Sequence, residues 1–134
     1  MKRLILFLCT LFSLSATNCK GKDSSFKETI KVVSPKVMQT LLAKDSIQLI
    51  DVRTPEEFEQ GYIEGAQNIN YLSATFNSDI KKLDKTKPVI LYCKSGGRSA
   101  KSSRKLLDIG FTEIYDLTGG ITRWKEEGFE ITIE

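Results

Sequence analysis

Residues 89–108 read VILYCKSGGRSAKSSRKLLD and are the most informative segment of the chain about its fold. Its first four residues, 89–92, form an apolar run that is typical of a strand buried in a parallel sheet. A loop with two adjacent glycines follows. Residues 98–109 then show a helical pattern that ends at Gly110, a favourable residue just beyond a helix C-terminus. A strand, a tight loop and a helix in this order predict one unit of an α/β fold.

The rest of the chain continues the alternation of strands and helices. Strands are predicted over residues 29–33, 47–52, 66–70, 89–92 and 113–115. Helices are predicted over residues 34–44, 54–61, 73–83, 98–109 and 119–128. The first of these helices is expected to bury one face, made of Val37, Met38, Leu41 and Leu42. The sequence therefore predicts a single α/β domain, with a central, mostly parallel sheet and helices on both faces.

Composition narrows the chemistry that this chain can perform. The formal net charge is +3, and it falls to +1 when Lys2 and Arg3, which precede an apolar leader, are set aside. Basic residues form no stripe interleaved with aromatic ones, so nucleic acid is not an expected partner. The chain contains no histidine. This excludes metal sites built on imidazole, Ser-His-Asp triads and Cys-His dyads.

The N-terminus has the pattern of a targeting segment. Two positive charges precede an apolar run from Leu4 to about Leu14, as in a signal peptide. We expect residues 1–18 to be that signal peptide, 19–28 a polar tether and 29–134 the folded domain. Cleavage after Ser15 is one alternative; the other is that Cys19 is the lipid acceptor of a bacterial lipoprotein. Either leads us to expect export to the bacterial periplasm or cell envelope, with a membrane anchor if Cys19 is lipidated.

Export also changes the interpretation of the cysteines. Cys9 lies in the leader and Cys19 at its end, so Cys93 is the one cysteine inside the predicted domain. No disulfide can then link two parts of that domain. A single thiol in an oxidising compartment is either buried or used.

The surroundings of Cys93 favour a functional thiol. The residue ends a central strand, and ligands of α/β sheets bind beyond the carboxyl ends of the strands. The loop from Lys94 to Arg98 can turn its backbone N–H groups inward, because glycine accepts dihedral angles that other residues avoid. Such amides at a helix N-terminus stabilise a thiolate or a charged adduct on its sulfur. The alternative is a buried structural cysteine before an ordinary glycine-containing turn.

Three separated motifs resemble those of the rhodanese (thiosulfate sulfurtransferase) family. Residues 93–99, CKSGGRS, are similar to its active-site loop, Cys-Arg/Lys-x-Gly-x-Arg followed by Ser. Residues 49–58 and 61–69, LIDVRTPEEF and GYIEGAQNI, resemble its Asp-Val-Arg and Gly-His-Ile-x-Gly-Ala motifs, with Tyr62 in place of the histidine. Residues 117–128 resemble its Leu-x-Gly-Gly…Trp…Gly motif. Together the motifs cover about residues 36–129.

The resemblance implies a role for each site residue. Cys93 is the expected nucleophile, which takes a sulfane sulfur from thiosulfate or a similar donor, becomes a persulfide and passes the sulfur to an acceptor by ping-pong kinetics. The loop that holds the persulfide consists of Lys94, Ser95, Gly96, Gly97, Arg98 and Ser99. Arg98 either binds donor oxygens or braces the loop, and Lys94 is expected at the pocket mouth. Asp51, Arg53 and Glu57 are expected to have a structural role, as an ion-pair network. Gly119, Gly120 and Trp124 are expected to form a turn and part of the core.

The resemblance also implies the partners and leaves alternatives open. The expected partners are a small sulfur donor and a thiol or cyanide-type acceptor, with a protein as an alternative acceptor. The resemblance implies no cofactor and no metal. The protein is expected to be a monomer. One alternative is a sulfur carrier or a non-catalytic rhodanese-like binding module. A cysteine phosphatase or arsenate reductase is disfavoured, because only four residues separate Cys93 from Arg98 and such enzymes need five.

Overall fold

The computed structural model describes residues 30–134. The predicted signal peptide, Cys19 and the tether lie outside the described residues. Within the described part of the chain, no helix is long and apolar enough to cross a membrane.

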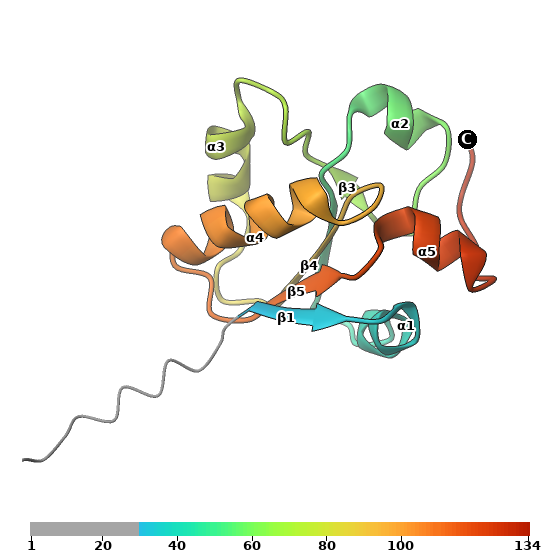
Figure 1. Ribbon diagram of the computed structural model, residues 1–134. Coiled ribbons are helices and arrows are strands. Elements are labelled where there is room, and N and C mark those ends of the chain that lie inside the picture. The colour runs from blue at the N-terminus through green and yellow to red at the C-terminus, as the bar shows by residue number, and fades with distance from the viewer. Residues whose placement is uncertain (1–29) are drawn as a thin grey trace, which may run out of the picture.

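A five-stranded sheet forms the centre of the domain (Figure 1). Its strands are β1 (Ile30–Val33), β2 (Gln48–Asp51), β3 (Gln67–Asn68), β4 (Val89–Tyr92) and β5 (Ile114–Leu117). They lie in the order β1-β5-β4-β2-β3, and every neighbouring pair is parallel. The prediction of a mostly parallel sheet is confirmed. The strand that precedes Cys93, β4, lies in the middle of the sheet, and the structure buries all four of its residues.

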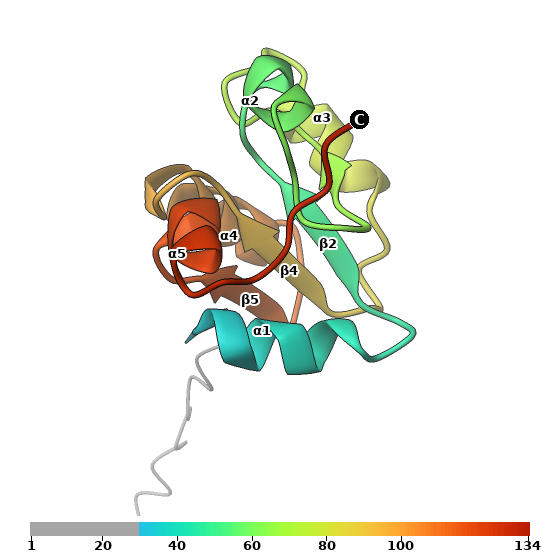
Figure 2. The ribbon, with the colours of Figure 1, turned by 90° about the vertical axis from the view of Figure 1, so that its right-hand side faces the viewer.

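Helices cover both faces of this sheet, as predicted. They are α1 (Pro35–Leu42), α2 (Pro55–Glu59), α3 (Phe76–Asp79), the 3₁₀ turn η1 (Ile80–Lys82), α4 (Gly97–Asp108) and α5 (Gly120–Glu126). Figure 1 shows α3 and α4 on one side of the sheet and α1 on the other. In Figure 2, α1 and α5 lie in front of the strands, with α3 and α4 behind them. The parallel sheet is thus shielded from water on both sides, as such sheets require.

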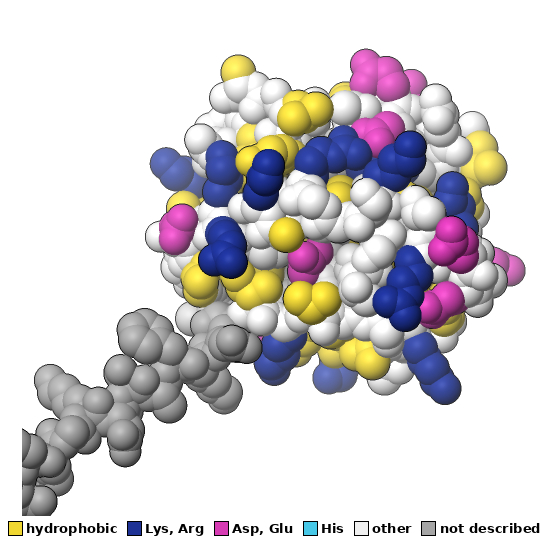
Figure 3. All heavy atoms as spheres, in the orientation of Figure 1, with side chains coloured by type: hydrophobic (Ala, Val, Ile, Leu, Met, Phe, Trp, Pro, Cys, Tyr) yellow, Lys and Arg dark blue, Asp and Glu magenta, His cyan; other side chains and the backbone are white. Residues whose placement is uncertain are grey.

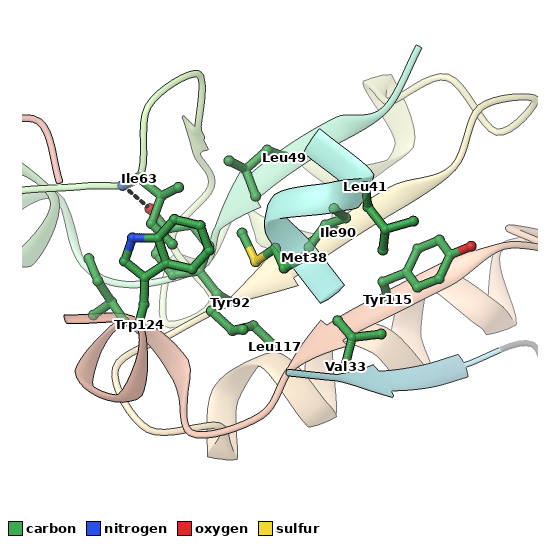
Figure 4. Packing of buried hydrophobic residues seen from close by; sticks show 11 residues of the cluster. Val33, Met38, Leu41, Leu49, Ile63, Ile90, Tyr92, Tyr115, Leu117 and Trp124 are labelled. Atoms are coloured by element: carbon green, nitrogen blue, oxygen red, sulfur yellow. Dashed lines mark hydrogen bonds between the residues drawn. The ribbon is translucent and has the colours of Figure 1, made fainter. Parts of the chain in front are cut away.

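Two hydrophobic clusters fill the spaces between the sheet and its helices. Side chains of a strand alternate between the two faces, so β4 serves both clusters. Ile90 and Tyr92 join Met38 and Trp124 on the face covered by α1 and α5 (Figure 4). Val89, Leu91 and Cys93 join the cluster under α3 and α4. Cys93, the candidate nucleophile, therefore packs in the hydrophobic core and directly follows the central strand.

Two predictions about helices are wrong in detail. The helix expected over residues 73–83 is reduced to α3 and η1. Ahead of α3, Asn70 and Ser73 accept hydrogen bonds from the backbone N–H groups two residues further on, and these local bonds compete with a helix. Val37 was expected in the core but is 47% exposed, whereas Met38 and Leu41 are buried as expected, so the buried face of α1 is narrower than predicted.

Candidate active site

Cys93 lies directly after β4, at the carboxyl end of the central strand, and the loop 94–96 leads from it into α4. Only 1% of the residue is exposed. Lys94, Ser95 and Gly97 are exposed around it, whereas Ser99 is buried. The sulfur thus lies at the base of the loop, at the edge of the sheet where parallel α/β domains bind ligands.

The loop turns hydrogen-bond donors toward the sulfur. Gly96 has a φ of 115°, a conformation that strongly favours glycine, and its backbone N–H donates to Cys93 Sγ over 3.1 Å. The thiol also lies 3.6 Å from the hydroxyl oxygen of Ser99, which is the third residue of α4. The inward-facing amides expected from the two glycines are thus present at Gly96.

These donors decide the ionisation of the thiol. Burial of Cys93 opposes the charged form, but hydrogen bonds from the backbone and hydroxyl of Ser99 and from the backbone of Gly96 and Ser95 outweigh it. The pKa of Cys93 is therefore lowered from its usual value. The site can activate a thiol without a histidine.

Arg98 points to α2, where its guanidinium binds the carboxylate of Glu57 with hydrogen bonds of 2.6 and 2.9 Å. Glu57 is held in turn by a capping box, in which its side chain accepts from the Thr54 backbone N–H and the Thr54 hydroxyl accepts from the Glu57 N–H. The bond to Arg98, against a smaller opposing effect of burial, lowers the pKa of Glu57 to about 2. In this geometry Arg98 braces the loop against α2; its direct binding of a donor stays a prediction.

Asp51 and Arg53 form a separate, buried pair. The guanidinium binds the carboxylate at 2.6 Å and donates a further hydrogen bond of 2.7 Å to the Gly61 carbonyl. Asn68 Nδ2 donates to the carbonyls of both Asp51 and Arg53. The ion-pair network expected for Asp51, Arg53 and Glu57 is therefore not formed: Asp51 pairs with Arg53, and Glu57 pairs with Arg98. The buried pair fixes the segment between β2 and α2.

Gly120 packs against the backbone of the loop, which the sequence did not reveal. A Cβ at this position would meet the carbonyl oxygen of Cys93 and would lie 2.5 Å from the Lys94 carbonyl. The adjacent backbone N–H of Ile121 donates to the Cys93 carbonyl over 2.9 Å, and Thr122 N–H donates to that of Lys94 over 3.1 Å. Gly119-Gly120 thus have a second role besides the expected turn: the turn packs against the backbone of the loop and supports it. The paired glycines were the available signal.

Asp116 is a second residue near the site that was not predicted from the sequence. It lies in β5 and is 6% exposed. Burial raises the pKa of its carboxyl to about 6, and the Ser99 hydroxyl acts on it in the opposite direction. One acidic residue within the apolar strand IYDL was the signal that could have identified it.

Exposed basic side chains lie on the loop and along α4. Lys94 is exposed, as are Lys101 and Arg104 on the outer side of α4. Figure 3 shows Lys and Arg side chains gathered across the face that carries this helix. Such a surface attracts anions toward the N-terminus of α4.

Comparison with known proteins agrees with this geometry. A family model described as "Rhodanese-like domain" matches residues 34–127. The chain is 39% identical over 99 residues to the uncharacterized protein YqhL of Bacillus subtilis, covering 69% of this chain and 77% of that protein. It is 38% identical over 89 residues to thiosulfate sulfurtransferase 16, chloroplastic, of Arabidopsis thaliana, covering 59% and 74%.

A solved structure shares the fold as well as the sequence pattern. The crystal structure of a rhodanese-related protein from Thermoplasma volcanium superposes with a TM-score of 0.70 at 28% identity, covering 78% of this chain and 99% of that chain. The family match spans the segment from the N-cap of α1 to the end of α5, and so contains Cys93 and every residue that supports its loop. The chain belongs to the rhodanese-like domain family.

Proposed function

We propose that this protein is a sulfurtransferase that moves a sulfane sulfur from thiosulfate or a similar anionic donor to a thiophilic acceptor through a persulfide on Cys93. The observation that carries the proposal is the Cys93 sulfur, whose pKa is lowered by donors of the loop and of α4, with Gly96 N–H at 3.1 Å. Similarity to proteins named thiosulfate sulfurtransferase supports the same class of reaction.

The first half-reaction transfers one sulfur atom and leaves a persulfide. The Cys93 thiolate attacks the outer sulfur of thiosulfate, a new S–S bond forms to Cys93, and the bond between the two thiosulfate sulfurs breaks. Its electron pair leaves with sulfite, so charge and atoms balance and no external oxidant is needed. The backbone N–H groups that face the sulfur are suited to stabilising the terminal sulfur of the anionic persulfide.

The second half-reaction regenerates the thiolate. An acceptor nucleophile, such as cyanide, a thiol or a protein thiolate, attacks the terminal sulfur, and the S–S bond electrons return to Cys93. Because sulfite leaves before the acceptor binds, the proposal predicts ping-pong kinetics. Exposed Lys94 at the mouth of the loop supplies positive charge for the oxygens of the donor.

The same site is poorly suited to phosphate chemistry. A cysteine phosphatase needs an arginine directed at the oxygens of its substrate, and the loop arginine here is bound to Glu57 through two hydrogen bonds. The loop between Cys93 and Arg98 is also one residue shorter than such enzymes require.

Intact-protein mass spectrometry after incubation with thiosulfate tests the proposal. The wild type should gain one sulfur atom, about 32 Da, and lose it on adding cyanide or a thiol. The Cys93→Ser variant should gain nothing. Absence of the adduct on a folded, reduced wild type would contradict thiosulfate as donor. An adduct that small acceptors cannot remove would indicate a sulfur carrier that discharges to a protein.

We also propose that the protein is exported and anchored through a lipid on Cys19. The support is the pattern of the first 19 residues, with two positive charges, an apolar run and then the cysteine. Metabolic labelling with a radioactive fatty acid in a bacterial host should label the wild type but not a Cys19→Ser variant. Equal labelling of both would contradict the anchor.

A further inference from the structure

A cavity of about 390 Å³ lies beside α2 and contains no residue of the Cys93 loop. Its lining residues are Pro55, Phe58, Glu59, Tyr62, Asn68 and Glu134. The end of the chain reaches this cavity because the backbone of Thr132 pairs with that of Tyr62. Figure 1 and Figure 2 both show the C-terminal end beside α2. A cavity of this size can hold a small molecule or one side chain of another protein.

Two stacked aromatic rings border the cavity. Phe58, in α2, and Tyr62, just beyond it, have ring centroids 4.2 Å apart and ring planes inclined by 10°. Both side chains line the cavity, and both residues are only partly buried. The face of an aromatic ring carries partial negative charge and attracts cations, most often the guanidinium of arginine. The stacked pair therefore favours a cationic ligand.

The polar side chains of the cavity have acceptor atoms to offer and no unused donor. Asn68 Nδ2 spends both of its hydrogens on two backbone carbonyls, at and just beyond the end of β2, so Oδ1 is the amide atom left to a ligand. The Tyr62 hydroxyl donates its one hydrogen to Glu134 Oε1 over 2.8 Å, and its oxygen can still accept. The carboxylates of Glu59 and Glu134 only accept. A ligand must therefore bring the hydrogen-bond donors.

The negative charge of the cavity has no counter-ion within the chain. None of the salt bridges among residues 30–134 involves Glu59 or Glu134, and no basic residue lines the cavity. Arg53 and Arg98 are each bound to a different carboxylate. A hollow lined by charges of one sign raises the local concentration of ions of the opposite sign. The charge of the cavity thus agrees with its aromatic wall in favouring a cation.

We propose that this cavity binds an organic cation with a guanidinium group, either as a free small molecule or as an arginine side chain of a partner protein. The plane of the guanidinium lies against the stacked rings. Its N–H groups donate to the carboxylates of Glu59 and Glu134 and to Asn68 Oδ1. A guanidinium suits the cavity better than an ammonium, because it is planar and has five N–H donors for separate acceptors. No group of side chains among residues 30–134 is arranged to hold a metal ion, so the cation is organic.

The short helix α2 contributes to both this cavity and the support of the Cys93 loop. Glu57 binds Arg98 at the start of α4, and the next two residues, Phe58 and Glu59, line the cavity. Asn68 also holds the backbone that leads from β2 into α2. A ligand in the cavity therefore rests on the helix that braces the loop. Because it binds the folded protein, its occupancy should stabilise α2 against local opening.

Titration of the isotope-labelled full chain with argininamide, followed by NMR, tests the site. The backbone amide signals of Phe58, Glu59, Tyr62, Asn68 and Glu134 should shift along one saturable curve. Citrullinamide has the same shape but a neutral urea in place of the guanidinium, and it should bind at least about tenfold more weakly. Added salt should weaken the binding of argininamide, because the carboxylates are exposed. Equal shifts with argininamide and citrullinamide would overturn the proposal.

Charge-neutral variants show whether the two carboxylates hold the cation. The double variant Glu59→Gln, Glu134→Gln keeps the size of both side chains and an acceptor for the Tyr62 hydroxyl, and it should bind argininamide about tenfold more weakly. Glu56→Gln, an exposed acid of α2 that does not line the cavity, is the control and should bind like the wild type. Wild-type affinity in the double variant would also overturn the proposal.

Two further measurements separate the site from Cys93 and identify the source of the cation. Cys93→Ser should bind argininamide as the wild type does, so the site stands or falls independently of persulfide formation. A short capped peptide with one arginine among glycines serves as the second probe. If the peptide binds the same residues, a partner protein's arginine can occupy the cavity. If argininamide alone binds, the ligand is a free small cation.

Discussion

Arg98 and Glu57 lie 41 residues apart in the chain and meet through two hydrogen bonds, of 2.6 and 2.9 Å, between the first turn of α4, next to the loop of Cys93, and α2. Both side chains are about a quarter exposed, so the pair is neither a surface contact nor a fully buried one. The guanidinium fork and the carboxylate fix the loop in two directions at once, which a single hydrogen bond cannot do. The stability of α2 is thereby linked to the geometry around the sulfur.

Glu57→Gln should weaken this link while keeping the capping box, since glutamine also serves at that position. We expect about 1 kcal/mol lower free energy of unfolding and about tenfold lower kcat/KM for sulfur transfer, because the loop is less firmly positioned. Urea unfolding and steady-state kinetics measure the two effects. Glu56→Gln, an exposed neighbour in the same first turn, is the control and should change neither. Unchanged kcat/KM in Glu57→Gln would show that the loop does not depend on this pair.

Gly120→Ala should damage both the fold and the loop. The residue has a φ of 59°, and a Cβ would lie 2.5 Å from the Lys94 carbonyl. We expect a loss of about 2 kcal/mol or more in the free energy of unfolding and a loss of persulfide formation in the molecules that fold. Gly128→Ala is the matched control, with a φ of 84° and no atom within 4 Å of the new Cβ. It should cost about 1 kcal/mol and leave persulfide formation intact.

Asp116→Asn should change how stability depends on pH. Burial raises the pKa of Asp116 from 3.8 to about 6. The stability that the protonated carboxyl contributes is therefore fully present below pH 3.8 and is lost as the pH rises through 6. The asparagine of the variant does not titrate, so the variant does not lose this stability. The free energy of unfolding of the variant minus that of the wild type should therefore be about 1–3 kcal/mol larger at pH 8 than at pH 4. Chemical unfolding at both values measures this. A pH-independent difference between the two proteins would show that the carboxyl does not titrate in this range.

Asp51→Asn should separate a structural role from a catalytic one. It leaves the buried guanidinium of Arg53 without its counter-ion, which should lower the free energy of unfolding by about 3 kcal/mol. Turnover per folded molecule, measured at low temperature, should fall far less, because neither residue contacts Cys93. Asp45→Asn, at an exposed position before β2, is the control and should be neutral. A stable variant without turnover would instead place Asp51 in the chemistry.

Local signals in the sequence were sufficient for most of the secondary structure. Ser34-Pro35 and Thr54-Pro55 start helices where predicted, because a side-chain cap and a proline act within one turn. The run Val89–Tyr92 is a buried central strand, and the helix after it ends within a residue of the predicted position. The helix expected over residues 73–83 failed because polar side chains of that segment bind neighbouring backbone groups, a competition that periodicity does not register.

The order of strands and helices, the parallel sheet and the position of Cys93 between a buried strand and a helix N-terminus could all be predicted from the amino-acid sequence. These follow from hydrophobic periodicity, caps and glycines, which act over a few residues. Which charges pair, the packing of Gly120 against the loop, and the burial of Asp116 on the sheet face that Leu91 and Cys93 share depend on tertiary packing. These depend on strand register and on how α2, α4 and α5 pack, so they join residues distant in the chain whose proximity no local pattern encodes.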